Sequence, residues 1–185
     1  MPAFDQLTLN TRRLLLRPLR DSDADALLEL FSDLKVMRYW STPPWESIEQ
    51  ARSMIERDVK AMATGDHVRL GLERTEDGVL IGMCTLFAIS EQCRRAEVGY
   101  AIASHAWGKA YMDEALRALL NYGFSKLMLN RVEADVDPRN EASARSLERL
   151  GFKKEGYLRE RWIVGDEVSD TALYGLLNRD WHWRA

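Results

Sequence analysis

Residues 96–115, which read AEVGYAIASHAWGKAYMDEA, decide how this chain is interpreted. Ala96 to Ala103 is predicted to form a strand, and a helix is predicted from about Lys109 to Lys126, where apolar side chains repeat at helical spacing. The first N–H groups of a helix have no internal partner and carry partial positive charge, so they can bind an anion such as a pyrophosphate. Every strand-to-helix loop has free amides, so a plain connection is the alternative reading.

The rest of the chain predicts one central sheet with helices packed on its faces. No repeat, low-complexity tract or linker divides it, so we expect a single domain over residues 1–185. Asp21-Ser22 is the expected cap of the first helix, whose apolar face includes Leu34, and the stripe of the second helix includes Val59. The elements expected around the first segment are a strand (12–18), two helices on either side of a Pro-Pro loop, strands 67–73 and 79–87, a strand (131–136), a helix capped by Asn140, and strands 155–164 and 168–177.

The composition is that of an ordinary globular protein, with 46% hydrophobic and 30% charged residues. A net charge of -3 gives no electrostatic basis for nucleic acid or an anionic membrane as partner. Cys84 and Cys93 fit neither a metal-ligand spacing nor a disulfide framework, and the histidines share no ligand spacing, so we expect no metal. Without a signal-like start or an apolar run of ~18 residues, we expect a cytoplasmic protein with two buried or half-buried thiols.

Further motifs extend the opening segment on its C-terminal side. They are NRVEADV (130–136), NEAS (140–143), LERLGF (147–152) and EG (155–156). With these motifs the chain resembles the GNAT superfamily of acyl-CoA N-acetyltransferases, and within it the RimJ/RimL-like branch that acetylates ribosomal-protein N-termini. The resemblance runs from LLLRPL at 14–19 to LLNRDW at 176–181. It implies a GNAT-like α+β three-layer fold, with a mixed, mostly antiparallel sheet of about seven strands splayed at the acyl-CoA site and about four helices on its faces.

The resemblance also implies where acetyl-CoA binds. The family's phosphate loop, Gln/Arg-x-x-Gly-x-Gly/Ala, corresponds to Trp107 to Met112, and the pantetheine arm would lie beside Val98 to Ala103, with one strand amide facing the thioester carbonyl. Asn140 would contact the pantetheine, or simply cap its helix. Ala110 and Met112 replace small residues of the loop, which would weaken or abolish binding unless both are accommodated. The implied donor-binding residues are Val98, Tyr100, Ile102, Ala103, Trp107, Gly108, Lys109, Ala110, Tyr111, Met112 and Asn140.

Acetyl transfer needs a deprotonated amine, an oxyanion site and a partner for the departing thiolate. Glu97, on the splayed strand, is the candidate base, with a plain surface carboxylate as the alternative. Leu147 occupies the position where many family members have an acidic Tyr. Ser143 matches a serine that this branch carries near the sulfur, and is the candidate partner of the thiol, or else completes the helix start. Glu160 is a second candidate base.

The expected acceptor is a primary amine, and the resemblance favours a protein or peptide N-terminal α-amino group, attacked directly in a ternary complex. A small amine (amino acid, polyamine or drug) is one alternative, and a non-catalytic acyl-CoA-binding or ribosome-associated module is another. The aromatic run Met37-Arg38-Tyr39-Trp40 and Trp45 flank the Pro-Pro loop, and either shape the amine pocket or pack in the core. A monomer and a homodimer are both compatible with the sequence.

Overall fold

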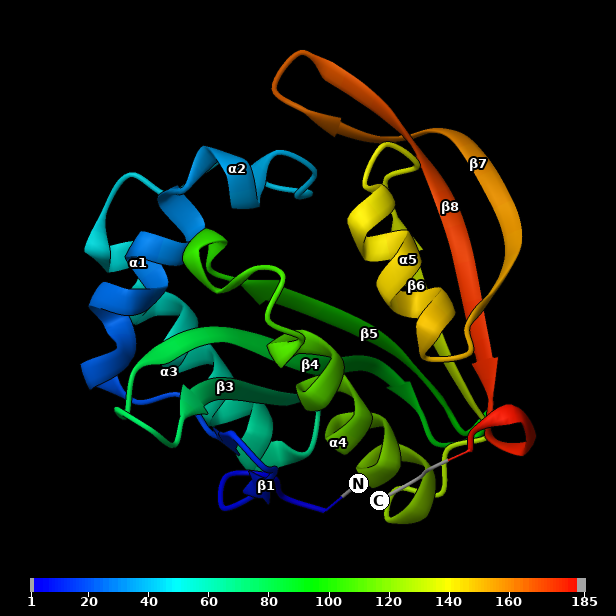
Figure 1. Ribbon diagram of the computed structural model, residues 1–185, viewed down its shortest axis with the longest axis horizontal. Helices are drawn as coiled ribbons and strands as arrows, with labels where there is room; N and C mark the ends of the chain where they lie inside the picture. The colour runs from blue at the N-terminus through cyan, green and yellow to red at the C-terminus, as the bar shows by residue number, and fades with distance from the viewer. Residues whose placement is uncertain (1, 183–185) are drawn as a thin grey trace.

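Eight strands form a single mixed sheet in the order β1-β2-β3-β4-β5-β6-β8-β7. The computed structural model (Figure 1) describes residues 2–182. All neighbouring strands are antiparallel except β5 and β6, which are parallel. The strands are β1 (Leu9–Asn10), β2 (Leu14–Arg17), β3 (Val68–Arg74), β4 (Leu80–Ser90), β5 (Arg95–Ile102), β6 (Arg131–Val136), β7 (Lys153–Val164) and β8 (Glu167–Leu177).

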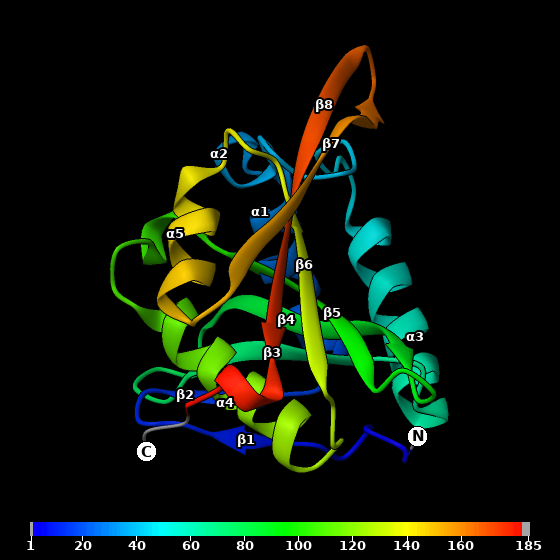
Figure 2. The same ribbon diagram turned by 90° about the vertical axis from the view of Figure 1, so that its right-hand side faces the viewer.

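Helices cover both faces of this sheet, as the view in Figure 2 makes clear. Strand side chains alternate between the faces, so Met83 and Ala101 pack in one core with α1 and α3, whereas Leu86 and Val98 pack in the other with α4 and α5. The predicted α+β three-layer fold is therefore confirmed, with the two-residue β1 as an additional strand. The helices are α1 (Ala24–Ser32), α2 (Leu34–Met37), α3 (Ile48–Thr64), α4 (Tyr111–Ser125) and α5 (Glu141–Arg149).

Three local expectations were wrong. The first helix ends at Ser32 because Asp33 is extended, with ψ 110°, and caps α2 through a hydrogen bond from the Lys35 amide, so Leu34 belongs to α2 and is 73% exposed. Val59 lies just off the buried stripe of α3 and is 52% exposed. Cys93 is exposed in the link between β4 and β5, whereas Cys84 is buried as expected.

The start of α1 also differs from the expected cap. Asp21 begins a single turn of 3-10 helix, and Asp23 is the N-cap of α1 without a side-chain capping bond. The Asp23 carboxylate is engaged elsewhere, because it accepts two hydrogen bonds from the buried Arg17 guanidinium, at 2.7 and 2.8 Å. The same carboxylate accepts the Arg20 backbone N–H at 2.8 Å, so this buried ion pair and a cap of the 3-10 turn together fix the chain between β2 and α1.

The parallel pair β5 and β6 separates after three residue pairs, the last of which is Glu97 with Glu133. Beyond this point β5 stays paired to β4 as far as Ile102, and β6 stays paired to β8 as far as Val136. The sheet therefore opens into a V between its two halves, visible in Figure 1 as the divergence of β5 from β6 and β8. None of the helices within residues 2–182 is long and apolar enough to cross a membrane.

Candidate active site

A cavity of about 680 Å³ occupies the opening between β5 and β6. Its walls come from the two diverging strands, the segment after α2, the start of α5 and the β7–β8 hairpin. Glu97, Val98, Tyr100, Asn140 and Ser143 all line it. Residues that the sequence analysis assigned to different steps of one reaction are therefore adjacent in space.

The two candidate catalytic side chains approach this opening from opposite faces of the sheet. Glu97 is on the same face of β5 as Ala101, which packs against α1 and α3. Tyr100 is on the other face, where its hydroxyl reaches Ser143 of α5. Because the strands are splayed, one cavity connects the two faces, so groups held on either side can react with a molecule threaded between them.

Glu97 has the properties of a base. Burial, followed by repulsion from Glu133 and Asp135, raises the pKa of its carboxyl above the ordinary value, although Arg95 and Arg161 oppose part of this shift. Within residues 2–182 no hydrogen bond or ion pair occupies its carboxylate. A carboxylate with a raised pKa and no partner accepts a proton more readily than a paired one.

Ser143 is held in place by two contacts on α5 and β5. Its backbone N–H donates to Asn140 Oδ1 at 3.1 Å, so Asn140 caps the helix as expected. Its Oγ lies 2.7 Å from the Tyr100 hydroxyl oxygen. Burial raises the pKa of Tyr100 to about 12, so this phenol stays protonated at neutral pH.

A backbone amide of β5 also faces the opening. The Ala103 N–H donates to the Ile81 carbonyl of β4 at 2.8 Å, whereas the Ile102 carbonyl accepts from the Trp107 indole and thus faces away from β4. Successive residues of an antiparallel strand direct their amides to opposite edges. Tyr100 has the same parity as Ile102 and lies beyond Glu97, the last residue of β5 paired with β6, so its N–H faces the gap left by β6 and can donate to an oxyanion.

The loop before α4 offers a row of unpaired amides. The N–H groups of residues 108–112 donate to no atom of the described chain, and the first helix bond there is from Glu114 to the Ala110 carbonyl. Gly108 and Ala110 both have positive φ, 74° and 59°, which curls the loop. The Met112 side chain turns into the core instead of covering these amides. Such a loop at a helix N-terminus suits a phosphate group.

Arg13, which the sequence analysis missed, fastens this loop to β2. Its Nη1 donates to the Lys109 carbonyl at 2.9 Å, and its Nε donates to Glu114 at 2.7 Å. Its guanidinium also lies 4.4 Å from the centre of the Tyr111 ring. The contact spans about a hundred positions of sequence, and no local pattern signals it.

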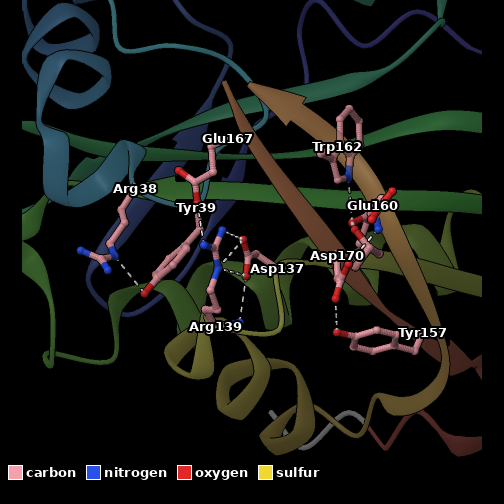
Figure 3. Close-up of polar contacts among 11 residues, drawn as sticks. Arg38, Tyr39, Asp137, Arg139, Tyr157, Glu160, Trp162, Glu167 and Asp170 are labelled. Atoms are coloured by element: carbon pink, nitrogen blue, oxygen red, sulfur yellow. Dashed lines mark hydrogen bonds and ion pairs between the residues drawn. The ribbon is translucent and has the colours of Figure 1, made fainter. Parts of the chain in front are cut away.

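The outer mouth of the cavity is bridged by Arg139, from the β6–α5 loop (Figure 3). Its guanidinium pairs with Asp137 at 2.6 Å and with Glu167 of the β7–β8 hairpin, also at 2.6 Å. It lies 5.7 Å from the ring of Tyr39, whose hydroxyl accepts a hydrogen bond from Arg38 Nε. Arg139 thereby connects three separate segments around the mouth.

The side chains that line the cavity include equal numbers of arginines and carboxylates, four of each. Asp135 accepts hydrogen bonds from Thr171 at 2.7 Å and from the Trp162 indole at 3.3 Å, so it too is engaged. Glu97 is thus the one lining carboxylate among the described residues whose oxygens accept no hydrogen bond. The lining arginines are Arg38, Arg69, Arg139 and Arg161, and the lining carboxylates are Glu97, Asp135, Asp137 and Glu167.

The remaining candidate residues differ in whether they line the cavity. Glu160 is at a bulge of β7, where its amide donates to Asp170 (Figure 3), and it does not line the cavity. The Ile102 carbonyl and the Ala103 amide are both engaged in hydrogen bonds, as described above. Of the aromatics near the Pro-Pro loop, Tyr39 and Trp40 line the cavity, whereas Trp45 packs on Phe31 with ring centres 4.5 Å apart.

The chain is similar to known acetyltransferases in sequence and in fold. The family model described as acetyltransferase (GNAT) domain matches residues 13–153. The "Uncharacterized N-acetyltransferase YoaA" of Bacillus subtilis is 39% identical over 169 residues, which are 91% of this chain and 96% of that protein. The "Putative ribosomal N-acetyltransferase YdaF" of the same organism is 40% identical over 105 residues, 57% of each chain. The crystal structure of spermidine N-acetyltransferase from Vibrio cholerae in complex with CoA and spermine superposes with a TM-score of 0.80, at 26% identity, covering 90% of this chain and 96% of that one.

Proposed function

The chain belongs to the GNAT acetyltransferase family and is an N-acetyltransferase, and from this premise we propose that it transfers the acetyl group of acetyl-CoA to the N-terminal α-amino group of a protein or peptide. One observation supports this acceptor. The arginines and carboxylates that line the cavity are equal in number, and Glu97 is the one lining carboxylate of the described residues that accepts no hydrogen bond.

The residues on the donor side fit acetyl-CoA. The free amides of residues 108–112 would hold the pyrophosphate, with Lys109 adding charge and Arg13 keeping the loop in shape. Met112 leaves the amides open, which removes one of the two objections that the sequence raised. The pantetheine arm would then pass Val98 and enter the opening between β5 and β6.

The cavity connects the two faces of the sheet, with Glu97 on one face and Ser143 on the other, and the steps of the reaction can be divided between them. The amine enters on the face of Glu97, which takes its proton directly or through water, and the neutral nitrogen attacks the thioester carbonyl. The backbone N–H of Tyr100 stabilises the oxyanion of the tetrahedral intermediate. The intermediate collapses with cleavage of the C–S bond, and the thiolate leaves on the face of Ser143. Neither cysteine carries the acyl group, because Cys84 is buried and burial raises its thiol pKa to about 12, whereas Cys93 lies outside the cavity.

The charges of the cavity support an acceptor with one amine. A polyamine carries several positive charges and needs several free carboxylates, but Asp135, Asp137 and Glu167 are already engaged by donors of this chain. Glu97 is left for a single amine. Beyond it, the guanidinium of Arg139 retains N–H groups that can meet the carbonyl oxygens of a peptide. A peptide N-terminus matches this pattern better than a polycation.

A small amine is the second candidate, because one of the structural neighbours is a spermidine N-acetyltransferase. A panel separates the two. We expect acetylation of peptides with a small or polar first residue, detected by mass spectrometry at the α-amino group, and little turnover of spermidine, spermine or an aminoglycoside. As a control, the same peptides with a blocked N-terminus and a free lysine should react poorly, because a lysine ammonium titrates near ~10.4 and an α-ammonium near ~7.7–8.0. Efficient polyamine turnover without peptide acetylation would favour the second candidate.

The Ala110 position gives a test of the donor site. Coenzyme A at about 100 times its Kd should raise Tm by about 5–10 °C, because it stabilises only the folded chain. Ala110→Gly should keep or tighten binding, because glycine tolerates the positive φ of 59° and removes a methyl group beside the amides. Ala110→Val is the matched control, since a β-branched residue is strained there and should reduce the Tm shift. Loss of binding in Ala110→Gly would contradict the placement of the pyrophosphate.

A further inference from the structure

The hydroxyl groups of Tyr100 and Ser143 form a contact that brings together residues 43 positions apart in the sequence. The two oxygens are 2.7 Å apart, and Tyr100 Oη is also 3.4 Å from the Ser143 carbonyl. The Tyr100 ring packs against the core formed with α4 and α5. Both residues line the cavity between β5 and β6, so the contact is at the edge of the space where the thiol would leave.

The direction of this hydrogen bond follows from the chemistry of the two hydroxyl groups. Tyr100 keeps its single proton at neutral pH. If Ser143 donated to Tyr100, that phenolic proton would be left with the Ser143 carbonyl at 3.4 Å, which is a poor hydrogen bond. If Tyr100 donates to Ser143 Oγ at 2.7 Å instead, a strong bond forms and the Ser143 proton is free to point into the cavity. The second arrangement is favoured, because a phenol is the stronger hydrogen-bond donor and an aliphatic hydroxyl oxygen is the stronger acceptor.

We infer that Tyr100 is a positioning residue, which donates to Ser143 so that the serine hydroxyl donates to the sulfur of the leaving thiolate. This inference rests on the proposed use of acetyl-CoA, but it holds for any acceptor amine. Tyr100 of β5 would thus set the orientation of the Ser143 hydroxyl on α5. It also gives a physical account of how the chain works with Leu147 at the position where the resemblance leads one to expect an acidic tyrosine.

The pair stabilises the thiolate by hydrogen bonding and does not supply its proton. An alkyl thiol has a pKa near ~8.5, whereas the pKa of Tyr100 is about 12, so a thiolate cannot take the phenolic proton to any large extent. The proton lost by the amine reaches Glu97 or water on the opposite face, and the thiolate is protonated from solvent. One proton leaves the nitrogen and one reaches the sulfur, so the reaction is balanced.

The thiol pKa of bound coenzyme A measures this contact without any acceptor. It can be followed by the ultraviolet absorbance of the thiolate, in a Cys93→Ser background, with desulfo-coenzyme A as the blank. We expect Ser143→Ala to raise the bound thiol pKa by about one unit or more, because a hydrogen bond to a charged group is lost. Tyr100→Phe should raise it by a similar amount, and the double variant should raise it no further than Ser143→Ala alone.

Steady-state kinetics provide a second measurement. With any amine that the protein acetylates, Tyr100→Phe should lower kcat about tenfold and leave the KM for acetyl-CoA within about twofold, because the bond forms to the departing charge. Tyr122→Phe is the matched control, since Tyr122 is half-buried on α4 and outside the cavity, and it should leave kcat unchanged. Both variants keep the ring that packs in the core, and their Tm values check that they fold.

The outcomes are distinct. A wild-type thiol pKa and kcat in Tyr100→Phe would overturn the inference, and so would a double variant whose thiol pKa exceeds that of Ser143→Ala by a further unit, because Tyr100 would then act on the sulfur itself. Failure of the wild-type protein to bind coenzyme A would instead refute the proposed donor.

Discussion

Glu97→Gln is expected to lower kcat about 100-fold at neutral pH, within the usual range for a positioned acid–base group. The carboxylate must be ionised to accept a proton, so wild-type activity should fall as pH drops through its pKa, which burial, Glu133 and Asp135 hold above the ordinary value. An α-ammonium titrates near ~7.7–8.0, so raising the pH lets solvent deprotonate the amine and should restore part of the activity of the variant.

Glu133→Gln is the matched control for this change. Glu133 is opposite Glu97 on the neighbouring strand and pairs with Arg95 and Arg131. Removing its charge should lower the pKa of Glu97, so the acidic limb of the pH–rate profile should move to lower pH while the maximal rate is kept. A Glu97→Gln variant with the wild-type rate and an unchanged profile would exclude Glu97 as the base and leave bound water in that role.

Ser143→Ala is expected to lower kcat by about 10²-fold at every pH, because a donor to the developing charge is lost. High pH should not rescue it, since the defect concerns the leaving thiolate and not the amine. The helix start should survive, because Asn140 caps it through the Ser143 backbone N–H, which the change leaves in place.

Ser146→Ala on the same helix controls for the loss of a serine. Ser146 is half-buried outside the cavity, and its hydroxyl donates to the Ala142 carbonyl, so its replacement should leave kcat unchanged. An active Ser143→Ala variant would return Ser143 to a purely structural role at the start of α5.

Local sequence patterns predicted much of the frame of the site. The strand predicted at 131–136 has those bounds in the structure, and Asn140 occupies the helix-cap position that its chemistry favours. Two predictions for Met112 competed. Its position among the apolar residues of the predicted helix indicated a core side chain, whereas its position in the phosphate loop indicated a side chain that obstructs the backbone amides. The structure places the side chain in the core.

Contacts between distant segments could not be predicted in the same way. Helical spacing did not reveal that Asp33 breaks the first helix, because the break depends on one extended residue between apolar ones. Arg13 with Glu114, Arg139 with Glu167 and Tyr100 with Ser143 are joined by the fold alone. Arg139 follows Asp137-Pro138 at the end of a strand, which was the one available signal for a residue at the mouth. The sequence therefore indicated the chemistry of the site, and the fold determines which groups meet.

A crystal structure with coenzyme A bound would locate the donor relative to these residues. We expect the pyrophosphate to accept hydrogen bonds from the amides of residues 108–112, the pantetheine to pass between β5 and β6, and the sulfur to lie within hydrogen-bonding distance of Ser143 Oγ, with Glu97 on the opposite side of the thiol. A coenzyme A molecule that leaves those amides free, or whose sulfur lies outside the opening and away from Ser143, would show that donor and acceptor do not meet across the splayed strands.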